Sequence, residues 1–243
     1  MMDANPVILT NAITKSFRHV QALRGVSVRV DRGKITAVVG DNGSGKSTLI
    51  KILSGSHRPD SGSICIDGRD YSALSIRQSM DLGIRTVYQD LSLDDCKNSF
   101  ENVFLGGERM KGLFLDRKRM REETACLLEE IRVQIPDLTE PVRNLSGGQR
   151  QGLAIARALR SSCRVLLLDE PTAAMGIQES HSALNILRTL RDKGLTQIIV
   201  SHNLAQVFDL ADFVYVMRSG EVIASAATKD ITPEDLRELI LYS

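Results

Sequence analysis

Residues 40–47 read Gly-Asp-Asn-Gly-Ser-Gly-Lys-Ser, which matches the pattern G-x-x-x-x-G-K-[ST]. A short apolar run, residues 35–39, precedes this loop, and a helix is predicted from Ser47 to about Ser54. Glycines allow successive backbone N–H groups to turn toward a phosphate, and the positive end of the helix adds to the attraction. The stretch therefore predicts a nucleotide-binding loop between a buried strand and a helix. The residues assigned to it are Gly40, Asp41, Asn42, Gly43, Ser44, Gly45, Lys46, Ser47 and Thr48.

The spacing also predicts separate tasks within the loop. Lys46 is expected to reach the β- and γ-phosphates of the nucleotide, and the Ser47 hydroxyl to bind Mg²⁺. A second apolar run, residues 165–168, ends in Asp169-Glu170. Open α/β sheets hold their ligands at the carboxyl ends of their strands, so Asp169 is expected in the Mg²⁺ shell. Glu170, one residue further on, is a candidate general base for an attacking water.

Two more side chains are candidates because of where they stand. His202 follows the predicted strand at residues 198–200, where it can contact the γ-phosphate or fix the water. Gln89 lies where the sheet gives way to a helical segment, and without the other motifs it reads as a surface glutamine. A carboxylate pair after a strand is, taken alone, most simply a solvated strand end. Beside a phosphate-binding loop, the catalytic interpretation is favoured.

A second glycine-rich helix start occurs at residues 144–150, Asn-Leu-Ser-Gly-Gly-Gln-Arg. Ser146 and Gln149 fit an S-x-x-Q capping box, which explains these two residues. It does not explain Gly147 and Gly148, since glycine in a helix costs about 1 kcal/mol relative to alanine. Close approach of the backbone to a ligand does explain them.

The order of the predicted elements indicates an α/β fold with a mainly parallel sheet. The opening third has β-branched runs at residues 7–9, 26–30 and 64–66, which predict an antiparallel β subdomain. Residues 90–162 show helical patterns and no convincing strand, and helical amphipathicity is clearest over residues 116–132. We expect one domain over residues 1–243, with an α/β core at 1–89 and 163–243 and a helical insertion at about 90–162. The alternative is a continuous α/β domain with one long crossover.

Composition narrows the function classes. The formal net charge is +1, tryptophan is absent and aromatic residues make up 4% of the 243 residues, so neither a global charge nor stacking residues favour a nucleic-acid partner. The four cysteines are scattered, which is typical of reduced thiols in a cytosolic protein. No stretch approaches eighteen consecutive apolar residues, and no signal peptide is recognisable.

Taken in order and spacing, these motifs resemble the nucleotide-binding subunit of an ABC transporter, over about residues 7–238. The most specific element is Leu-Ser-Gly-Gly-Gln at residues 145–149, ahead of Asp-Glu-Pro-Thr at 169–172. The resemblance implies that Phe17 stacks on adenine, that Gln89 joins the Mg²⁺ and water shell and the link to a membrane partner, and that His202 contacts the γ-phosphate. It further implies ATP and Mg²⁺ as ligands.

The same resemblance implies a head-to-tail homodimer with two ATP molecules at the interface. Each ATP is held by one subunit's phosphate loop and covered by the other subunit's Ser146, Gly147, Gly148 and Gln149. A membrane permease is the implied partner, with an external solute-binding protein as an indirect one. The chain itself is expected at the cytoplasmic face of the inner membrane, as a peripheral subunit. Residues 88–105 are candidates for permease contact because Leu91, Leu93, Phe100 and Phe104 are more apolar than a solvated loop requires. Packing of these side chains within the helical insertion is an equal alternative.

Finer features resemble the ATPases of bacterial monosaccharide importers of the ribose, xylose and fructose kind. They are Glu-Asn-Val-Phe-Leu-Gly at residues 101–106, Ala-Ala-Met-Gly at 173–176 and Ser-His-Asn at 201–203. The wider family usually has an aspartate where this chain has Gly176, and that carboxylate helps to couple the two ATP sites. Alternatives are an importer of another small solute, a soluble ABC-type ATPase acting on ribosomes or DNA, and a nucleotide switch without turnover.

Overall fold

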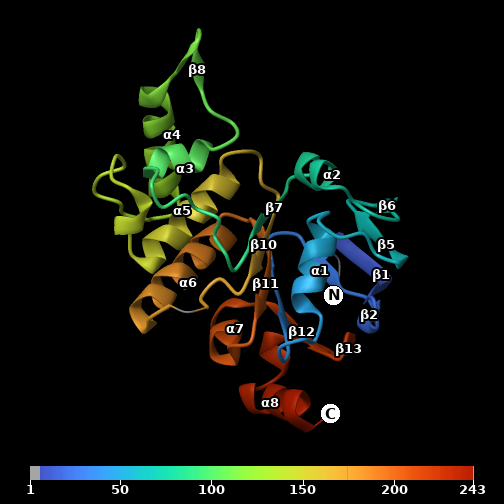
Figure 1. Ribbon diagram of the computed structural model, residues 1–243. Coiled ribbons are helices and arrows are strands. Elements are labelled where there is room, and N and C mark those ends of the chain that lie inside the picture. Colours follow the sequence, from blue (N-terminus) through green and yellow to red (C-terminus); the bar gives the residue numbers. More distant parts are fainter. Residues whose placement is uncertain (1–5, 174, 243) are drawn as a thin grey trace.

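The structure is a computed structural model that describes residues 6–173 and 175–242. Its centre is a six-stranded sheet in the order β13-β12-β4-β11-β10-β7 (Figure 1). The strands are β13 (Glu221–Ala227), β12 (Phe213–Arg218), β4 (Ile35–Val39), β11 (Thr196–Ser201), β10 (Val165–Asp169) and β7 (Ile84–Val87). Neighbouring strands from β12 to β7 pair in parallel, and β13 pairs antiparallel with β12. This confirms the predicted mainly parallel sheet, and β12 and β13 form a hairpin about Ser219-Gly220.

A second, antiparallel sheet forms the β subdomain that the opening third of the sequence predicts. Its strands are β1 (Pro6–Phe17), β2 (Val20–Val26), β3 (Arg29–Asp31), β5 (Ser61–Ile66) and β6 (Arg69–Tyr71). The predicted strand at residues 26–30 is wrong, because the chain leaves β2 at Val26 and starts β3 at Arg29. At this break Val28 bonds to Thr10 on β1: the Thr10 Oγ1 accepts a hydrogen bond from the Val28 N–H at 2.9 Å, and the Thr10 N–H donates to the Val28 carbonyl.

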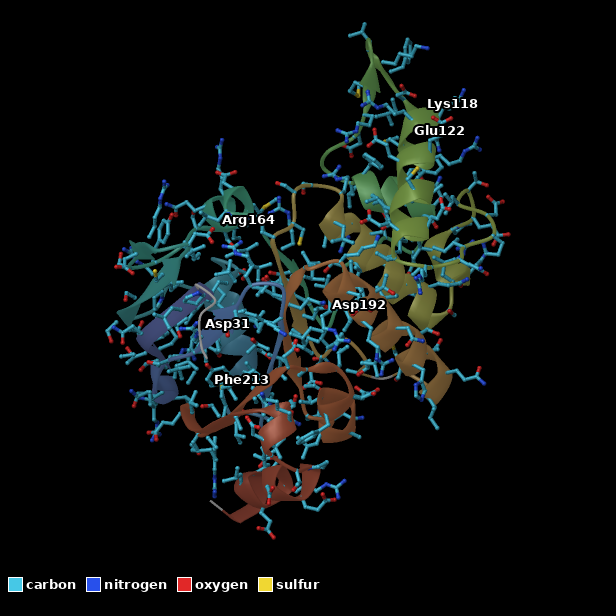
Figure 2. The ribbon with its side chains drawn as sticks, turned by 180° about the vertical axis from the view of Figure 1, so that it is seen from behind. Asp31, Lys118, Glu122, Arg164, Asp192 and Phe213 are labelled. Carbon is cyan, nitrogen blue, oxygen red and sulfur yellow. The ribbon has the colours of Figure 1, made fainter. Side chains whose placement is uncertain are left out.

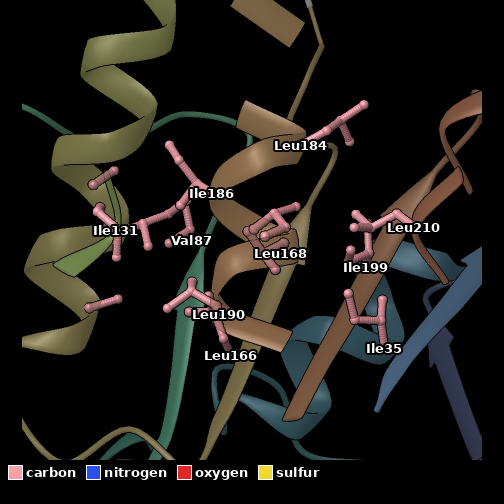
Figure 3. Close-up of a cluster of buried hydrophobic side chains, with 14 of the residues drawn as sticks. Ile35, Val87, Ile131, Leu166, Leu168, Leu184, Ile186, Leu190, Ile199 and Leu210 are labelled. Carbon is pink, nitrogen blue, oxygen red and sulfur yellow. The ribbon is translucent and has the colours of Figure 1, made fainter. Parts of the chain in front are cut away.

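Side chains alternate between the two faces of the parallel sheet, so that each strand contributes to two cores. On β10, Val165 and Leu167 join the core formed with the antiparallel sheet and α1 (Lys46–Leu53). Leu166 and Leu168 point to the other core, with α6 (Ile177–Asp192) and α7 (Leu204–Leu210) (Figure 3). Burial on both faces explains why this strand reads as a continuous apolar run.

Helices α3 (Ser99–Phe104), α4 (Arg117–Glu130) and α5 (Gly147–Leu159) pack against one another beyond the edge strand β7, with a short 3-10 turn at Val142–Asn144 before α5 (Figure 1). The prediction that this segment lacks strands is wrong, because β8 (Met110–Lys111) and β9 (Phe114–Leu115) form a small hairpin. Two-residue strands are too short to produce an alternating pattern in the sequence. Phe100 and Phe104 are buried in the core of this helical segment, and Leu91 and Leu93 pack against it. The intramolecular explanation of their apolar character therefore holds.

The remaining elements are α2 (Ile76–Asp81), a 3-10 turn at Thr228–Asp230 and the C-terminal α8 (Pro233–Tyr242). The start of α8 is capped: the Thr232 Oγ1 accepts a hydrogen bond from the Asp235 N–H at 3.1 Å, and the Asp235 carboxylate accepts one from the Thr232 N–H at 3.0 Å.

Candidate nucleotide-binding and hydrolysis site

The register of the parallel sheet places the predicted site residues at one edge. Ser201 lies opposite Val39, and Val200 lies opposite Asp169. The segments that follow β4, β10 and β11 therefore leave the sheet at the same level, at their carboxyl ends. These segments carry the phosphate-binding loop, Asp169-Glu170 and His202.

The loop from Gly40 to Gly45 needs glycine at two positions for reasons within the protein. Gly40 has φ +147°, and a Cβ on it would lie 2.0 Å from the Met217 carbonyl oxygen. Gly45 has φ +102°, and its Cβ would lie 2.5 Å from the Ala22 carbonyl oxygen. The hairpin β12–β13 also supports the loop, since the Gly220 N–H donates to the Ser44 carbonyl at 3.1 Å. Gly43 differs: a Cβ there would meet nothing within 4 Å of the described residues, so that side of the loop is open.

Lys46 lies almost fully buried at the start of α1, with its ammonium inside the loop. Its Nζ donates to the carbonyl oxygens of Gly40 at 2.7 Å and Asp41 at 2.8 Å. Burial lowers the pKa of Lys46 below its usual value, although the nearby carboxylates of Glu170 and Asp169 oppose this effect. A buried ammonium whose partners are mainly neutral carbonyls favours an anion at this position.

Ser47 and Asp169 meet across the site: the Ser47 Oγ donates to the Asp169 Oδ1 at 3.0 Å. Asp169 is buried, and burial raises the pKa of its carboxyl group. Mg²⁺ is commonly held by one or two protein oxygens together with nucleotide phosphates and waters. A hydroxyl and a carboxylate at this distance therefore fit Mg²⁺, although the described residues contain no cluster of three or more acidic, His or Cys side chains.

Glu170 adopts a left-handed backbone conformation, with φ +53°, that non-glycine residues rarely occupy. Its N–H donates to the Val200 carbonyl at 2.9 Å, which ties the turn to β11. The side chains of Glu170 and His202 lie in contact, with the His202 Nδ1 2.9 Å from the Glu170 Oε2; they are 12% and 63% exposed, respectively. The left-handed turn thus places the Glu170 carboxylate against a solvent-exposed histidine.

The other predicted residues lie at the periphery of this site. Gln89 is exposed, two residues after β7 ends. Phe17 ends β1 and is 41% exposed, with the His57 ring packed edge-on at 5.3 Å between centroids and the Lys15 ammonium 5.4 Å from its ring centre. An exposed aromatic ring held by its neighbours is suited to stack on a base.

The second glycine-rich segment lies elsewhere, at the start of α5. The predicted capping box is present: the Ser146 Oγ accepts from the Gln149 N–H, and the Gln149 Oε1 accepts from the Ser146 N–H. Ser146, Gly148 and Gln149 line an open groove of about 890 Å³ with α6 and residues 131–134, and none of residues 40–48 lines it. Within one chain, the phosphate-binding loop and the glycine-rich start of α5 therefore do not line the same pocket.

One residue that contacts this second segment, Glu179 on α6, is not predicted from the sequence. Its carboxylate accepts the Gly147 N–H at 2.8 Å, and a Cβ on Gly147 would lie 3.0 Å from both carboxylate oxygens. This contact explains the glycine at 147. A Cβ on Gly148 would make only ordinary contacts, the nearest at 3.5 Å. Within the described part of the chain no acceptor receives the Gly148 N–H, so Gly148 retains a donor for an external ligand.

The P-loop nucleoside triphosphatases have a lysine in a glycine loop after a parallel strand, together with a serine and an aspartate suited to a metal. This protein has the same arrangement and is of this class. Comparison with known proteins narrows the class. The chain belongs to the ABC transporter family, whose model matches residues 23–173.

Its relatives include the xylose/arabinose import ATP-binding protein of Sulfolobus acidocaldarius, which is 42% identical over 94% of this chain and 91% of that protein. The fructose import ATP-binding protein of Rhizobium meliloti is 37% identical over 96% of this chain and 93% of its own length. The ribose import ATP-binding protein of Yersinia pestis is 36% identical over 99% of this chain, which spans only 47% of that protein. A nucleotide-free ATP-binding cassette from an ABC transporter superimposes with a TM-score of 0.85 and 27% identity, over 98% of this chain and 100% of that one.

Proposed function

We propose that this chain is the ATP-hydrolysing subunit that energises import of a monosaccharide through a membrane permease. The observation that carries the proposal is that Lys46, Ser47 and Asp169 lie together next to Glu170, with Lys46 and Asp169 buried. A sugar as the cargo is supported by three relatives named for import of xylose or arabinose, ribose and fructose, at 36% to 42% identity.

In the proposed reaction, water attacks the γ-phosphate of ATP, the bond between the γ-phosphorus and the bridging oxygen breaks, and ADP and phosphate leave. Lys46 exchanges its loop carbonyls for phosphate oxygens. Ser47 and Asp169 would hold Mg²⁺, and Gln89 would join the Mg²⁺ and water shell. When bound, Mg²⁺ would supply positive charge that neutralises the charge developing on the phosphates.

Glu170 accepts the proton of the attacking water, and His202 holds the Glu170 carboxylate and contacts the γ-phosphate. The left-handed turn at Glu170 and the 2.9 Å contact with His202 support these roles, because strained backbone and pre-set polar contacts concentrate at functional sites. Phe17 stacks on the adenine ring.

The working unit in this proposal is a head-to-tail homodimer with two ATP molecules. Ser146, Gly147, Gly148 and Gln149 of each subunit cover the ATP held by the partner's loop. The open Gly148 N–H supports this assignment, as does the separation of α5 from the loop of its own chain. Ile177, next to Gly176, is 81% exposed, an apolar side chain that a dimer contact would cover.

The permease and an external solute-binding protein complete the proposed importer, with this chain peripheral at the cytoplasmic face of the membrane. In the described part of the chain, no helix is long and apolar enough to cross a bilayer. We also propose that residues 1–243 are one ABC ATPase domain, with residues 1–89 and 163–243 as its core and about 90–162 as a helical subdomain. The mutual packing of α3, α4 and α5 supports this division.

Glu170→Gln tests the hydrolytic part of the proposal. The amide keeps the shape of the side chain but cannot accept the proton, so turnover should fall by about 100-fold or more. ATP binding should persist, and size-exclusion chromatography with ATP should show accumulated dimer. Hydrolysis at the wild-type rate would remove Glu170 from the role of base.

A further inference from the structure

Glu179 joins the starts of two helices. Its Oε1 accepts the N–H of Gly147, the first residue of α5, at 2.8 Å. Its Oε2 accepts the N–H of Gly176, the residue that caps α6, at 3.2 Å. A carboxylate is favourable at a helix start because it meets unpaired N–H groups and the positive end of the dipole. Here one carboxylate serves two helices at once.

These two helix starts belong to different parts of the proposed machinery. Gly176 follows Glu170 by six residues, and in the proposed dimer Glu170 acts on the subunit's own ATP. Gly147 begins the helix whose first turn would cover the partner's ATP. Glu179 therefore connects, through two hydrogen bonds, the start of α5 with the start of α6, which follows the Glu170 turn in the sequence.

Glu179 also determines which donors remain for a phosphate. It occupies the N–H of Gly147, Ser146 Oγ occupies that of Gln149, and the Arg150 N–H donates to the Ser146 carbonyl. Gly148 keeps the open N–H. Rotation of α5 relative to α6 would move this donor, and the Glu179 bridge opposes such rotation.

We propose that Glu179 is a positioning residue that ties the start of α5 to Gly176 at the start of α6 and supplies the coupling between ATP sites that Gly176 cannot. This inference rests on the proposed function, specifically on the dimer with ATP at its interface. Glu179 touches no reacting atom; it acts through the backbone at Gly147 and Gly176.

The test uses the full chain in the Glu170→Gln background, where ATP-bound dimers accumulate. Glu179→Gln keeps the length of the side chain but removes its charge, and an amide oxygen replaces two charged acceptors. Hydrogen bonds to charged groups are the stronger kind, so ATP-driven dimerisation should require about 10-fold more protein. Binding of a fluorescent ATP analogue to the dilute monomer should change by less than about 2-fold, because the P-loop is untouched.

The matched control is Glu122→Gln, which makes the same change at an exposed glutamate in another helix. Glu122 lies on α4, where Figure 2 shows it beside Lys118 and away from the two sheets, and its carboxylate lies 3.9 Å from the ammonium of that lysine. Dimerisation of this variant should match its parent. A structural role for Glu179 would instead lower monomer nucleotide affinity and dimerisation together, and that result would overturn the inference.

A second variant tests whether Glu179 stands in for the missing carboxylate. Gly176 has φ −65°, an ordinary value for any residue, and among the described residues its Cβ would meet the Glu179 Oε2 at 3.8 Å and nothing nearer. Gly176→Asp should therefore be accommodated, and it should restore dimerisation when added to Glu179→Gln. Failure to restore dimerisation would show that Glu179 does not stand in for the missing carboxylate at position 176.

The remaining outcomes are equally decisive. Tighter dimerisation of Glu179→Gln would show that the carboxylate acts by repelling phosphate, and would contradict positioning. If the Glu170→Gln parent itself forms no dimer with ATP, the proposed dimer fails and this inference fails with it. A parent that dimerises and is unaffected by Glu179→Gln leaves the proposed function standing and refutes the inference alone.

Discussion

Replacing Gly40 with alanine tests why the phosphate-binding loop has its shape. The new Cβ would lie 2.0 Å from the Met217 carbonyl oxygen and 2.9 Å from the Ser44 Oγ, at a φ of +147°. The Met217 oxygen belongs to the backbone of β12, so the clash can be relieved only if the hairpin β12–β13 moves. Overpacking of this kind costs about 1–3 kcal/mol, and a non-glycine residue in this backbone region costs about 1–3 kcal/mol more. We expect Gly40→Ala to lower the free energy of unfolding by about 3–5 kcal/mol.

Gly43→Ala is the control within the same loop. Its φ is +82°, but a Cβ there meets nothing within 4 Å, so only backbone strain of about 1–2 kcal/mol is expected. Urea unfolding of the nucleotide-free protein, followed by circular dichroism, measures both losses. The two variants should differ by about 2–3 kcal/mol. Equal losses, or a Gly40→Ala loss within about 1 kcal/mol of zero, would refute the claim that β12 dictates glycine at position 40.

Three further predictions concern ligands and pH. Lys46→Ala should abolish measurable ATP affinity in calorimetry, because it removes the buried ammonium; retained tight binding would refute the P-loop assignment. Phe17→Ala should weaken ATP by about 10-fold or more, since base–aromatic stacking contributes about 1–3 kcal/mol, while tripolyphosphate binding stays constant; equal losses for both ligands would contradict stacking. Asp169→Asn should change the pH dependence of stability without nucleotide. Because burial raises the pKa of Asp169, its favourable contribution is present at acid pH and is lost as pH rises through the folded-state pKa. The variant should therefore gain stability relative to wild type from pH 4 to pH 8 in urea titrations, and a constant difference would count against the burial effect.

Much of the site could be predicted because its signals are local. The apolar strand, glycine loop and lysine at residues 35–46 are contiguous, and so are the strand and carboxylates at 165–170. Each such segment specifies its own turn chemistry. Parallel pairing through β11 then brings the two segments together, and the expected placement of Asp169 and His202 at the strand ends is confirmed.

The remaining features depend on contacts that are distant in sequence. Glu179 and Gly147 are separated by 32 residues, and a glutamate in the first turn of a helix reads as an ordinary capping residue. At the break between β2 and β3, Val28 bonds to Thr10, which lies 18 residues before it. The hairpin β8–β9 is too short for periodicity, although Leu113 and Phe114 at its tip are 92% and 80% exposed.

The assignment of the two glycines at 147 and 148 changed most between sequence and structure. Both resembled ligand-contacting positions by the same argument. The structure accounts for Gly147 by the Glu179 carboxylate and leaves Gly148 as the residue with an open donor. Two adjacent identical residues thus have different physical explanations.

The central claim is that this chain converts ATP hydrolysis into sugar import. It is tested most directly in proteoliposomes that contain the chain, its copurifying permease and the solute-binding protein, with radiolabelled D-xylose, D-ribose and D-fructose as probes. We expect ATP-dependent accumulation of at least one sugar with the wild-type chain, and none above background with Glu170→Gln. Accumulation that is equal with both chains, or ATP hydrolysis with no uptake of any of the three sugars, would contradict the account.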